Sequence, residues 1–316
     1  QVLADISGKD LIGLGYQHPF CDRQGRLVSA DYVTLEDGSG LVHIAPGHGT
    51  EDYQVGLQEG LEVYCPVLGD GTFDETAPDF LQGLSIWDGN PKVVDQLQST
   101  GHLFYTHSFM HSYPHDWRSK TPVIFRSTEQ WFVSVDRASE SGHDGLRQMA
   151  LNAIDNNIRF IPEWGQKRLR GMMESRPDWC LSRQRSWGLP IPAFRQQDGT
   201  VFMTASSILA ISQVFEKEGS DAWFKLTPEQ LLNEYRAEAD PDSPENLDVT
   251  QLEKMYDIFD VWFESGSSWK AVLEARFNTT IADVYLEGSD QHRGWFHLSL
   301  LPSVGIHQKA PFKHLI

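Results

Sequence analysis

The residues best suited to chemistry lie in the stretch 284–296, VYLEGSDQHRGWF, where an apolar run gives way to a polar turn and then to an amphipathic segment. This pattern predicts a strand, a loop and a helix. In an open α/β sheet, ligands bind beyond the carboxyl ends of the parallel strands. The loop residues would then face a nucleotide: Glu287, Gly288, Asp290 and Gln291.

Each of these loop residues has its own capacity. Gly288 lets the backbone approach a ligand closely, because it carries no side chain. Asp290 and Gln291 can hydrogen-bond the hydroxyl groups of a ribose, and Glu287 supplies a negative charge that suits an α-ammonium group. An ordinary polar turn between a strand and a helix would carry similar residues, and short patterns of this kind also occur by chance.

The stretch 41–53, LVHIAPGHGTEDY, holds a second set of reactive side chains. Its apolar start predicts a strand that leads into a glycine-rich loop, and the polar residues 50–52 can cap a helix beginning near Tyr53. His43 and Asp52 then flank one loop. Both also have a structural explanation, because aspartate is a common helix cap and a lone histidine often belongs to the packing.

The first part of the chain, residues 1–113, is predicted to form a mostly β module with few helices. Its strand-like alternation is interrupted by three turn dipeptides: Asp37-Gly38, Asp70-Gly71 and Asp88-Gly89. A helix is predicted over 91–98, where proline suits the first turn. Two β-rich runs, centred on 123–125 and 131–133, predict extended strands that leave this module.

The remainder of the chain alternates between helices and strands. Apolar periodicity predicts helices over 145–156, 165–174, 205–217 and 227–239, and an acidic, proline-bearing loop over 238–246. Together with the strand before Glu287, this alternation is typical of an α/β domain. The sequence therefore predicts a β-rich module joined to an α/β nucleotide-binding domain.

Length and composition limit the possible classes. A chain of 316 residues suggests about two domains. No apolar run approaches the roughly 20 residues of a membrane-spanning helix, so no membrane segment is expected. Cys21, Cys65 and Cys180 form no CxxC pair, which argues against a disulfide framework or a zinc site and fits a reducing cytoplasm.

The charge balance restricts how the chain could bind RNA. It carries 26 basic and 44 acidic residues, a net charge of −18. This sign opposes binding of nucleic acid through the overall field of the protein, so any RNA contact must be local. The candidate basic residues lie in one short region: Lys167, Arg168, Arg170, Arg176, Arg183 and Arg185. A solvated helix face would also explain this cluster of basic residues.

Four stretches, in order, resemble the isoleucyl-tRNA synthetases, a family of class I enzymes. Two are the stretches 41–53 and 284–296, the latter similar to the family's EGxDQxRGWF segment. The others are 178–192, DWCLSRQRSWGLPIP, and 260–266, DVWFESG. The resemblance runs almost from end to end and is weakest between about 195 and 253. It implies an internal segment of a longer enzyme, since the family's HIGH-type and KMSKS-type motifs do not occur in these residues.

The resemblance implies an α/β fold in which an incomplete Rossmann-like nucleotide-binding domain carries an inserted β-rich editing domain. With a boundary near Trp117, residues 1–117 would form the C-terminal part of the editing domain. Residues 118–316 would form part of the catalytic domain, with a helical insertion. Family counterparts of Trp262 and Trp295 wall the isoleucine pocket, and the resemblance places His43 and Asp52 in the editing site.

The implied activity is isoleucine–tRNA ligation. ATP, with Mg²⁺, and isoleucine would give isoleucyl-adenylate at the 287–291 loop, and the isoleucyl group would pass to tRNA(Ile). Mischarged valyl-tRNA(Ile) would be hydrolysed at the β module. No metal site is expected in this chain, and the enzyme would be a cytoplasmic monomer. Valyl- and leucyl-tRNA synthetases share this architecture and remain alternatives, as does a free-standing tRNA-editing or tRNA-binding module without synthetic activity.

Overall fold

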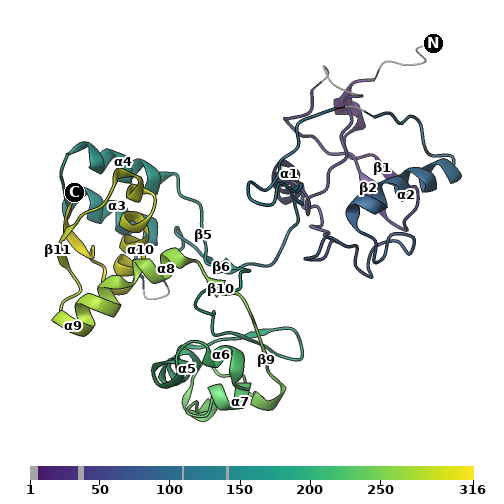
Figure 1. Cartoon of the computed structure of the whole chain (residues 1–316). Helices are drawn as coiled ribbons and strands as arrows, with labels where there is room; N and C mark the ends of the chain where they lie inside the picture. Colours follow the sequence, from purple (N-terminus) through teal and green to yellow (C-terminus); the bar gives the residue numbers. More distant parts are fainter. Residues whose placement is uncertain (1–5, 35–38, 109, 140–141) are drawn as a thin grey trace. The chain divides into compact units, whose positions relative to one another are not determined.

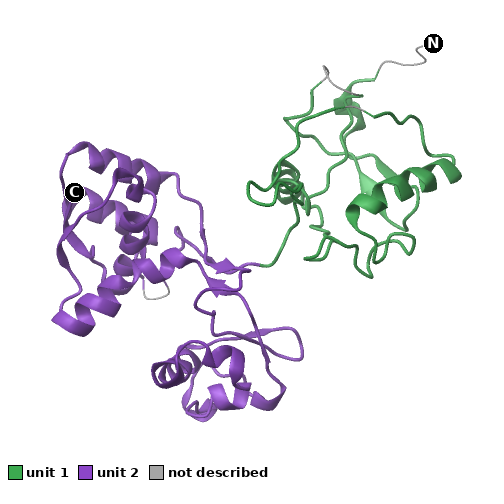
Figure 2. Ribbon diagram, viewed as in Figure 1, with its two compact units in different colours: residues 1–129 green, residues 130–316 purple. Residues whose placement is uncertain are grey.

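A computed structural model describes residues 6–34, 39–108, 110–139 and 142–316. The chain divides into two compact units, residues 1–129 and 130–316 (Figure 2). The division lies after Glu129, twelve residues beyond the boundary expected near Trp117. The intervening residues belong to the first unit because they are bonded to it. For example, the Ser127 N–H donates to the Gly47 carbonyl at 2.7 Å.

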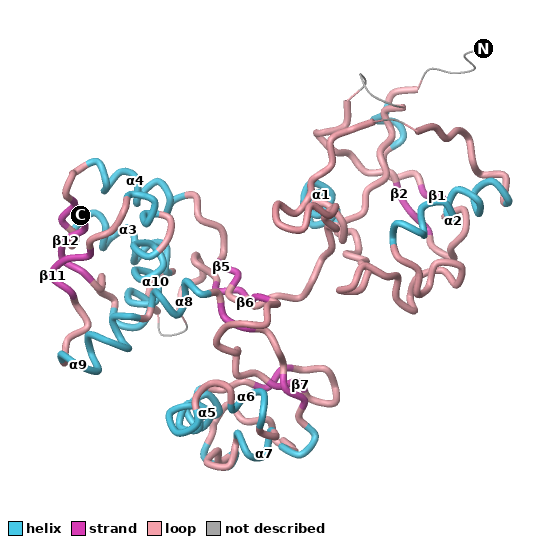
Figure 3. Tube along the Cα trace, in the orientation of Figure 1, coloured by secondary structure: helices cyan, strands magenta, loops and turns pink. Residues whose placement is uncertain are grey.

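The first unit is mostly loop in the residues described (Figure 3). The two short strands pair as an antiparallel hairpin, with Tyr16 opposite Gly25. The prediction of a mostly β module is therefore wrong for the described part of this unit. Its regular elements are η1 (Gly8–Leu11), β1 (Gly15–Gln17), β2 (Gln24–Arg26), α1 (Thr50–Glu59) and α2 (Ile86–Ser99) (Figure 1).

The turn dipeptides explain part of this difference. Asp70-Gly71 forms the predicted turn, with Gly71 at φ +83°, but it is flanked by an isolated bridge between Val67 and Phe73 and not by a pair of strands. Asp88-Gly89 lies inside α2, which begins at Ile86 rather than Pro91. A Cβ at Gly89 would lie 2.7 Å from the Phe73 ring, so this glycine permits close packing and marks no turn. The third dipeptide, 37–38, lies outside the described residues.

The second unit contains a three-stranded parallel sheet with the order β11-β12-β4. Its strands are β4 (Arg159–Phe160), β11 (Ala282–Tyr285) and β12 (Phe312–Leu315). Helix α10 (Trp295–His307) connects β11 to β12, as a parallel pair requires. Helices α3 (Leu146–Asn156) and α4 (Trp164–Glu174) share a core with α10 and the sheet. This arrangement confirms the prediction of an α/β fold for this part of the chain.

A second core in the same unit is formed by a short antiparallel sheet and small helices. The sheet has the order β8-β7-β9. The largest buried side chains of this core include Phe194, Phe202 and Trp223. The elements are β7 (Phe194–Arg195), β8 (Val201–Phe202), α5 (Ala205–Glu218), α6 (Ala222–Lys225), α7 (Pro228–Leu231), η2 (Ala237–Ala239), η3 (Val249–Gln251) and β9 (Glu253–Lys254).

The helices predicted over 145–156, 165–174 and 205–217 are confirmed as α3, α4 and α5. The single helix predicted over 227–239 is wrong, because α7 ends at Leu231. Beyond it, the Tyr235 ring packs against Phe202, and the Tyr235 hydroxyl donates to the buried Asp240 carboxylate at 2.8 Å. Tertiary contacts of one tyrosine thus replace the continuation of the helix.

Short elements connect the two cores. The run 131–133 provides β3 (Phe132–Val133), which pairs with β5 (Trp179–Cys180), whereas the described run 123–125 forms no strand. Strand β6 (Ser182–Arg183) pairs with β10 (Ile258–Phe259). The remaining elements are α8 (Val261–Gly266), the π-helical η4 (Trp269–Glu274), α9 (Ala275–Phe277) and η5 (Ser289–His292).

Candidate functional site

The end of β11 leads directly into the predicted polar loop. β11 ends at Tyr285, η5 spans the turn, and α10 begins at Trp295, so the predicted strand, loop and helix are confirmed. Because β11 runs parallel to β12, the loop lies beyond the carboxyl end of its strand, where ligands bind in open parallel sheets.

Two exposed carboxylates give this loop a negative charge. Glu287 accepts a hydrogen bond from the Gly288 N–H at 3.2 Å, and Asp290 accepts one from the side-chain amide of Gln291 at 3.0 Å. Both donors are neutral, and among the described residues neither carboxylate forms an ion pair. The loop therefore carries two uncompensated charges that attract a cationic group.

Gln291 ties this loop to the start of α10. Its Oε1 accepts from the Trp295 N–H at 2.9 Å, which satisfies one of the free donors at the helix N-terminus. Its amide nitrogen donates to Asp290 at the same time. Gln291 thus holds the loop against the helix.

The two tryptophans expected at the amino-acid pocket both lie near the start of α10. Trp295 stacks on Tyr285, and its indole N–H donates to the Ser265 carbonyl at 2.9 Å. The Trp262 ring lies against Gly294, where an added Cβ would be 2.9 Å from ring atom Cη2. Both tryptophans are half-buried and pack on the core of the sheet. The structure therefore brings both aromatic residues to the polar loop.

Helix α8, which carries Trp262, is fixed at both of its ends. Asp260 caps it by accepting from the Trp262 N–H at 3.2 Å, and also accepts from the Trp179 indole at 3.1 Å and from Arg183 at 3.0 Å. At the other end, Gly266 approaches the α10 backbone so closely that no side chain fits there. Asp260 had no predicted role, although an aspartate just before a helix is a typical cap.

The basic residues of 167–185 do not form one cationic patch. Arg170 is paired with Asp155 and Glu174, and Arg183 with Asp260. The Arg176 guanidinium lies over the Trp179 ring, 5.5 Å from its centroid, and burial lowers its pKa. Lys167, Arg168 and Arg185 remain exposed. Half of the predicted patch is therefore used inside the fold.

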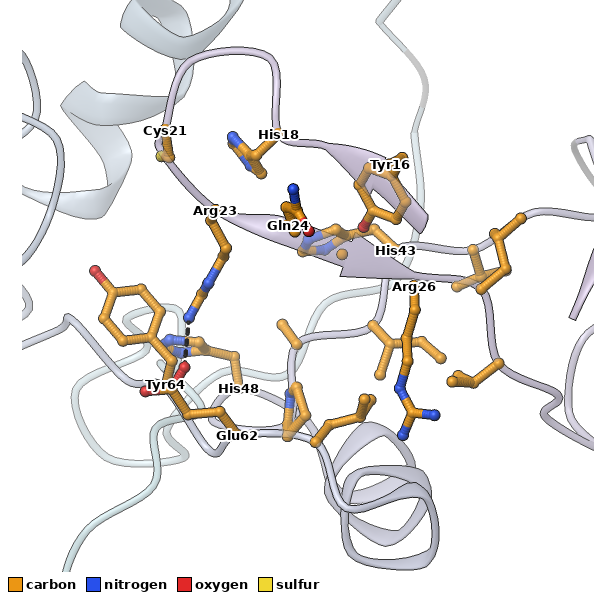
Figure 4. A pocket seen from close by; sticks show the side chains of 18 of the residues that line it. Tyr16, His18, Cys21, Arg23, Gln24, Arg26, His43, His48, Glu62 and Tyr64 are labelled. Carbon is orange, nitrogen blue, oxygen red and sulfur yellow. Dashed lines mark hydrogen bonds and ion pairs between the residues drawn. The ribbon is translucent and has the colours of Figure 1, made fainter. Parts of the chain in front are cut away.

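The first unit contains a cavity of about 1250 Å³ beside the β1–β2 hairpin (Figure 4). His43 lines it, as do His18, Arg23 and Glu62. Arg23 forms an ion pair with Glu62 at 3.2 Å and lies 4.3 Å from the centroid of the Tyr64 ring. Burial lowers the pKa of His18, and the nearby His43 and Arg23 lower it further, so His18 is neutral at pH 7. His18 and Arg23 had no predicted role.

Asp52 lies outside the described lining of this cavity, although it follows the same loop as His43. Its carboxylate accepts from the Tyr32 hydroxyl at 2.6 Å and from the Ala45 N–H at 2.9 Å. The structure thus places His43 in the lining of the cavity and Asp52 outside the described lining. Tyr32 carried no sequence signal, because its partner lies 20 residues away.

The predicted cap of the following helix is wrong. Helix α1 begins at Thr50, not near Tyr53. Its N-cap is Gly49, which has no side chain that could cap the helix. Asp52 lies in the first turn, where a negative charge is favourable, but its oxygens bind elsewhere. Helix capping therefore does not explain this carboxylate.

The remaining features of the described residues concern disulfides, metal sites and membrane-spanning helices. The three cysteines are free. No group of three histidine, cysteine or acidic residues gathers as metal ligands within the described ranges. None of the helices described is long and apolar enough to cross a membrane.

The chain is similar to known proteins along nearly all of its length. Residues 15–316 match the family described as tRNA synthetases class I (I, L, M and V). The chain is 46% identical to an isoleucine–tRNA ligase of Halorhodospira halophila, 44% to one of Persephonella marina and 46% to one of Acinetobacter baylyi. These alignments cover 99–100% of the chain but only 32–33% of each relative.

The chain thus spans about a third of the length of the curated relatives it matches. The family match nonetheless includes the β11 loop, both tryptophans and the loop of His43. With almost the whole chain matched, this protein belongs to the class I tRNA synthetases of the isoleucine, leucine, methionine and valine group.

Proposed function

We propose that this chain is an internal segment of an isoleucine–tRNA ligase. One structural observation carries the assignment: the loop after β11 places two uncompensated carboxylates near two half-buried tryptophans. An amino acid with an apolar side chain presents the matching groups, an ammonium cation and an alkyl chain. The names of the relatives support isoleucine as that amino acid.

The amino acid would bind at the start of α10. Glu287 would pair with the α-ammonium group through a charge-assisted hydrogen bond. Trp262 and Trp295 would flank the branched side chain, because flat apolar rings bury much of its surface at about 25 cal/mol per Å². This arrangement orients the carboxylate of isoleucine for reaction with ATP.

The nucleotide would bind along the same loop, at the carboxyl edge of a Rossmann-like sheet. Gly288 would let the backbone approach the adenylate, and Asp290 and Gln291 would bind the ribose hydroxyls. ATP enters as a substrate with Mg²⁺ on its phosphates. The second unit is then part of the catalytic domain, and the core around α5 and α7 is its helical insertion.

We propose that the first unit is the C-terminal part of an editing domain. A hydrophobic pocket separates substrates that differ by one methylene poorly, and isoleucine against valine is the standard example of this limit. A second, hydrolytic site would therefore remove the valyl-tRNA(Ile) that the first pocket fails to prevent. In the cavity, His43 would position water or the terminal ribose of valyl-tRNA(Ile). Asp52, which follows the same loop but lies outside the described lining, would provide charge for the ammonium group.

The partners follow from this reaction: tRNA(Ile), isoleucine and ATP. The net charge of −18 and the internal pairing of half the candidate patch favour local RNA contacts over a broad basic surface. Three free cysteines support a reducing compartment such as the cytoplasm. We propose a monomer, in which one chain carries both sites.

The test is ATP–pyrophosphate exchange by the full-length protein that contains these residues, with isoleucine, valine and leucine in turn. Isoleucine should give the highest kcat/KM, and valine should be activated more weakly. A preference for valine or leucine would assign the chain to that branch of the family. The 316-residue chain alone should show no exchange, since it lacks both ATP-handling motifs.

A free-standing editing or binding module is the second candidate, favoured by a separate first unit with its own large cavity. It predicts hydrolysis of valyl-tRNA(Ile) without amino-acid activation by any natural form of the protein. Exchange activity in the full-length protein excludes this candidate.

A further inference from the structure

Asp52 joins three segments of the first unit that are separate in sequence. It lies in the first turn of α1, and its Oδ1 accepts from the Tyr32 hydroxyl at 2.6 Å. Its Oδ2 accepts from the backbone N–H of Ala45 at 2.9 Å. One carboxylate therefore connects α1, the segment of Tyr32 and the loop that begins at His43.

The bond to Ala45 controls the loop that presents His43 to the cavity. Ala45 follows His43 by two residues, and its carbonyl accepts from the His48 N–H at 2.9 Å. The next residue, Pro46, packs against α1 so closely that a Cβ at Gly56 would lie 2.8 Å from the proline ring. The loop is thus held on α1 by one hydrogen bond and one packing contact.

The donors to Asp52 leave its charge available. A phenol and a backbone amide are neutral, and each carboxylate oxygen has a second lone pair that can accept another donor. Among the described residues no cationic side chain forms an ion pair with Asp52. A cationic group of a ligand that reached Asp52 from the adjoining cavity would therefore meet an oriented carboxylate without an ion-pair partner among the described residues.

Tyr32 is suited to orient this group. The residue is 38% exposed, so it contributes little to a core, and the bond to Asp52 is the main polar contact of its hydroxyl. Burial, the hydrogen bond to Asp52 and the charges of Asp52 and Glu51 raise its pKa to about 12. The phenol thus stays protonated, and remains a donor, throughout the physiological range.

We propose that Tyr32 is a positioning residue of the editing site: its hydroxyl fixes the carboxylate of Asp52 and, through Ala45, the loop of His43. This inference rests on the proposed editing function of the first unit. It predicts that Tyr32 acts on hydrolysis only through Asp52, and that it has no effect on amino-acid activation.

The test is a double-mutant cycle in the full-length enzyme, with Tyr32→Phe, Asp52→Asn and both together. The readout is kcat/KM for hydrolysis of valyl-tRNA(Ile), beside isoleucine-dependent exchange. Tyr32→Phe should lower hydrolysis about tenfold, the lower end for loss of a hydrogen bond to a charged group, because the bond is partly exposed. Asp52→Asn should lower it further, and the double variant should match Asp52→Asn alone.

Tyr53→Phe is the matched control. Tyr53 is also 38% exposed and adjoins Asp52 in α1. Tyr53→Phe removes a hydroxyl but should hydrolyse valyl-tRNA(Ile) at the natural rate. All four variants, the three of the cycle and this control, should retain isoleucine-dependent ATP–pyrophosphate exchange.

The cycle separates two failures. If Asp52→Asn hydrolyses valyl-tRNA(Ile) normally, the editing role of this unit is wrong and the inference falls with it. If Asp52→Asn is impaired but Tyr32→Phe is not, or if the two effects simply multiply, editing stands and the positioning role of Tyr32 is overturned.

A spectrophotometric titration of the 316-residue chain tests the Tyr32–Asp52 hydrogen bond without an activity measurement. The absorbance change that disappears in Tyr32→Phe reports Tyr32 alone among the nine tyrosines. It should titrate near pH 12, and Asp52→Asn should move it toward the ordinary value, because the negative charge that raises it is removed. An unchanged midpoint in Asp52→Asn would contradict the contact.

Discussion

The indole ring of Trp295 lies face to face on the phenol ring of Tyr285, with the ring centroids 3.9 Å apart and an angle of 4° between the planes. Tyr285 is the last residue of β11 and Trp295 the first of α10. The pair therefore joins the two ends of the polar loop that carries Glu287 and Asp290. This stack fixes the distance that the loop must span.

Replacing Tyr285 tests the value of this stack. Tyr285→Leu keeps an apolar side chain but removes the ring, so it should lower the free energy of unfolding by about 0.5–1.5 kcal/mol beyond the effect of lost area. Tyr285→Phe is the control that keeps the ring. Urea unfolding of the 316-residue chain measures both, and equal losses in the two variants would show that the stack contributes nothing.

Gly294 separates the Trp262 ring from the side chain of Gln291. A Cβ there would lie 2.9 Å from the ring and closer still to Gln291, so Gly294→Ala must displace both side chains. We expect the KM for isoleucine in ATP–pyrophosphate exchange to rise about tenfold, as the pocket wall moves. Gly171→Ala is the control, since nothing lies within 4 Å of a Cβ at that position in α4. A normal KM for Gly294→Ala would contradict the proposal that Trp262 lines a pocket for isoleucine.

Glu287→Gln keeps the shape of the side chain and removes the charge proposed to face the α-ammonium group. Loss of this charge-assisted bond should reduce kcat/KM for isoleucine activation by the equivalent of about 1.5–3 kcal/mol. Glu216→Gln, at an exposed position of α5, changes the net charge equally and should have no effect. Unchanged kinetics in Glu287→Gln would exclude Glu287 from the site.

His297, in α10, makes stability depend on pH. Burial lowers its pKa to about 3, and the nearby Arg176 and Arg293 also lower it. The unfolded chain binds a proton at this histidine below about pH 6.5 while the folded chain does not. Stability is therefore lost as the pH falls from 6.5 toward 3, by about 1.4 kcal/mol per pH unit.

The variant His297→Leu removes this group but keeps a large apolar side chain. Between pH 7.5 and 5.5, the natural chain should lose about 1.4 kcal/mol more of its unfolding free energy than the variant. The comparison uses the change between two pH values, so the effect of the substitution itself cancels. His18 and His292, whose pKa values burial also lowers, are present in both proteins. Equal losses would contradict a neutral, buried His297.

Local patterns predicted the elements near the polar loop after β11. The stretch 284–296 indicated a strand, a loop and a helix, and the structure has β11, η5 and α10 there. Helices α3, α4 and α5 were also predictable, because an apolar face at helical spacing is a property of neighbouring residues. The same local signals failed at Asp88-Gly89, where packing against Phe73 and a serine cap hold the dipeptide in α2.

The sequence by itself determined which residue types stand at the candidate sites, from Glu287 and Gln291 to His43 and Asp52, and which family they resemble. Only the tertiary structure decided their partners. The Tyr32 hydroxyl donates a hydrogen bond to Asp52, which lies 20 residues away in the sequence. The Trp179 indole donates one to Asp260, 81 residues away. Such bonds depend on packing that brings distant segments together and removes their polar groups from water, and no pattern of neighbouring residues encodes that choice.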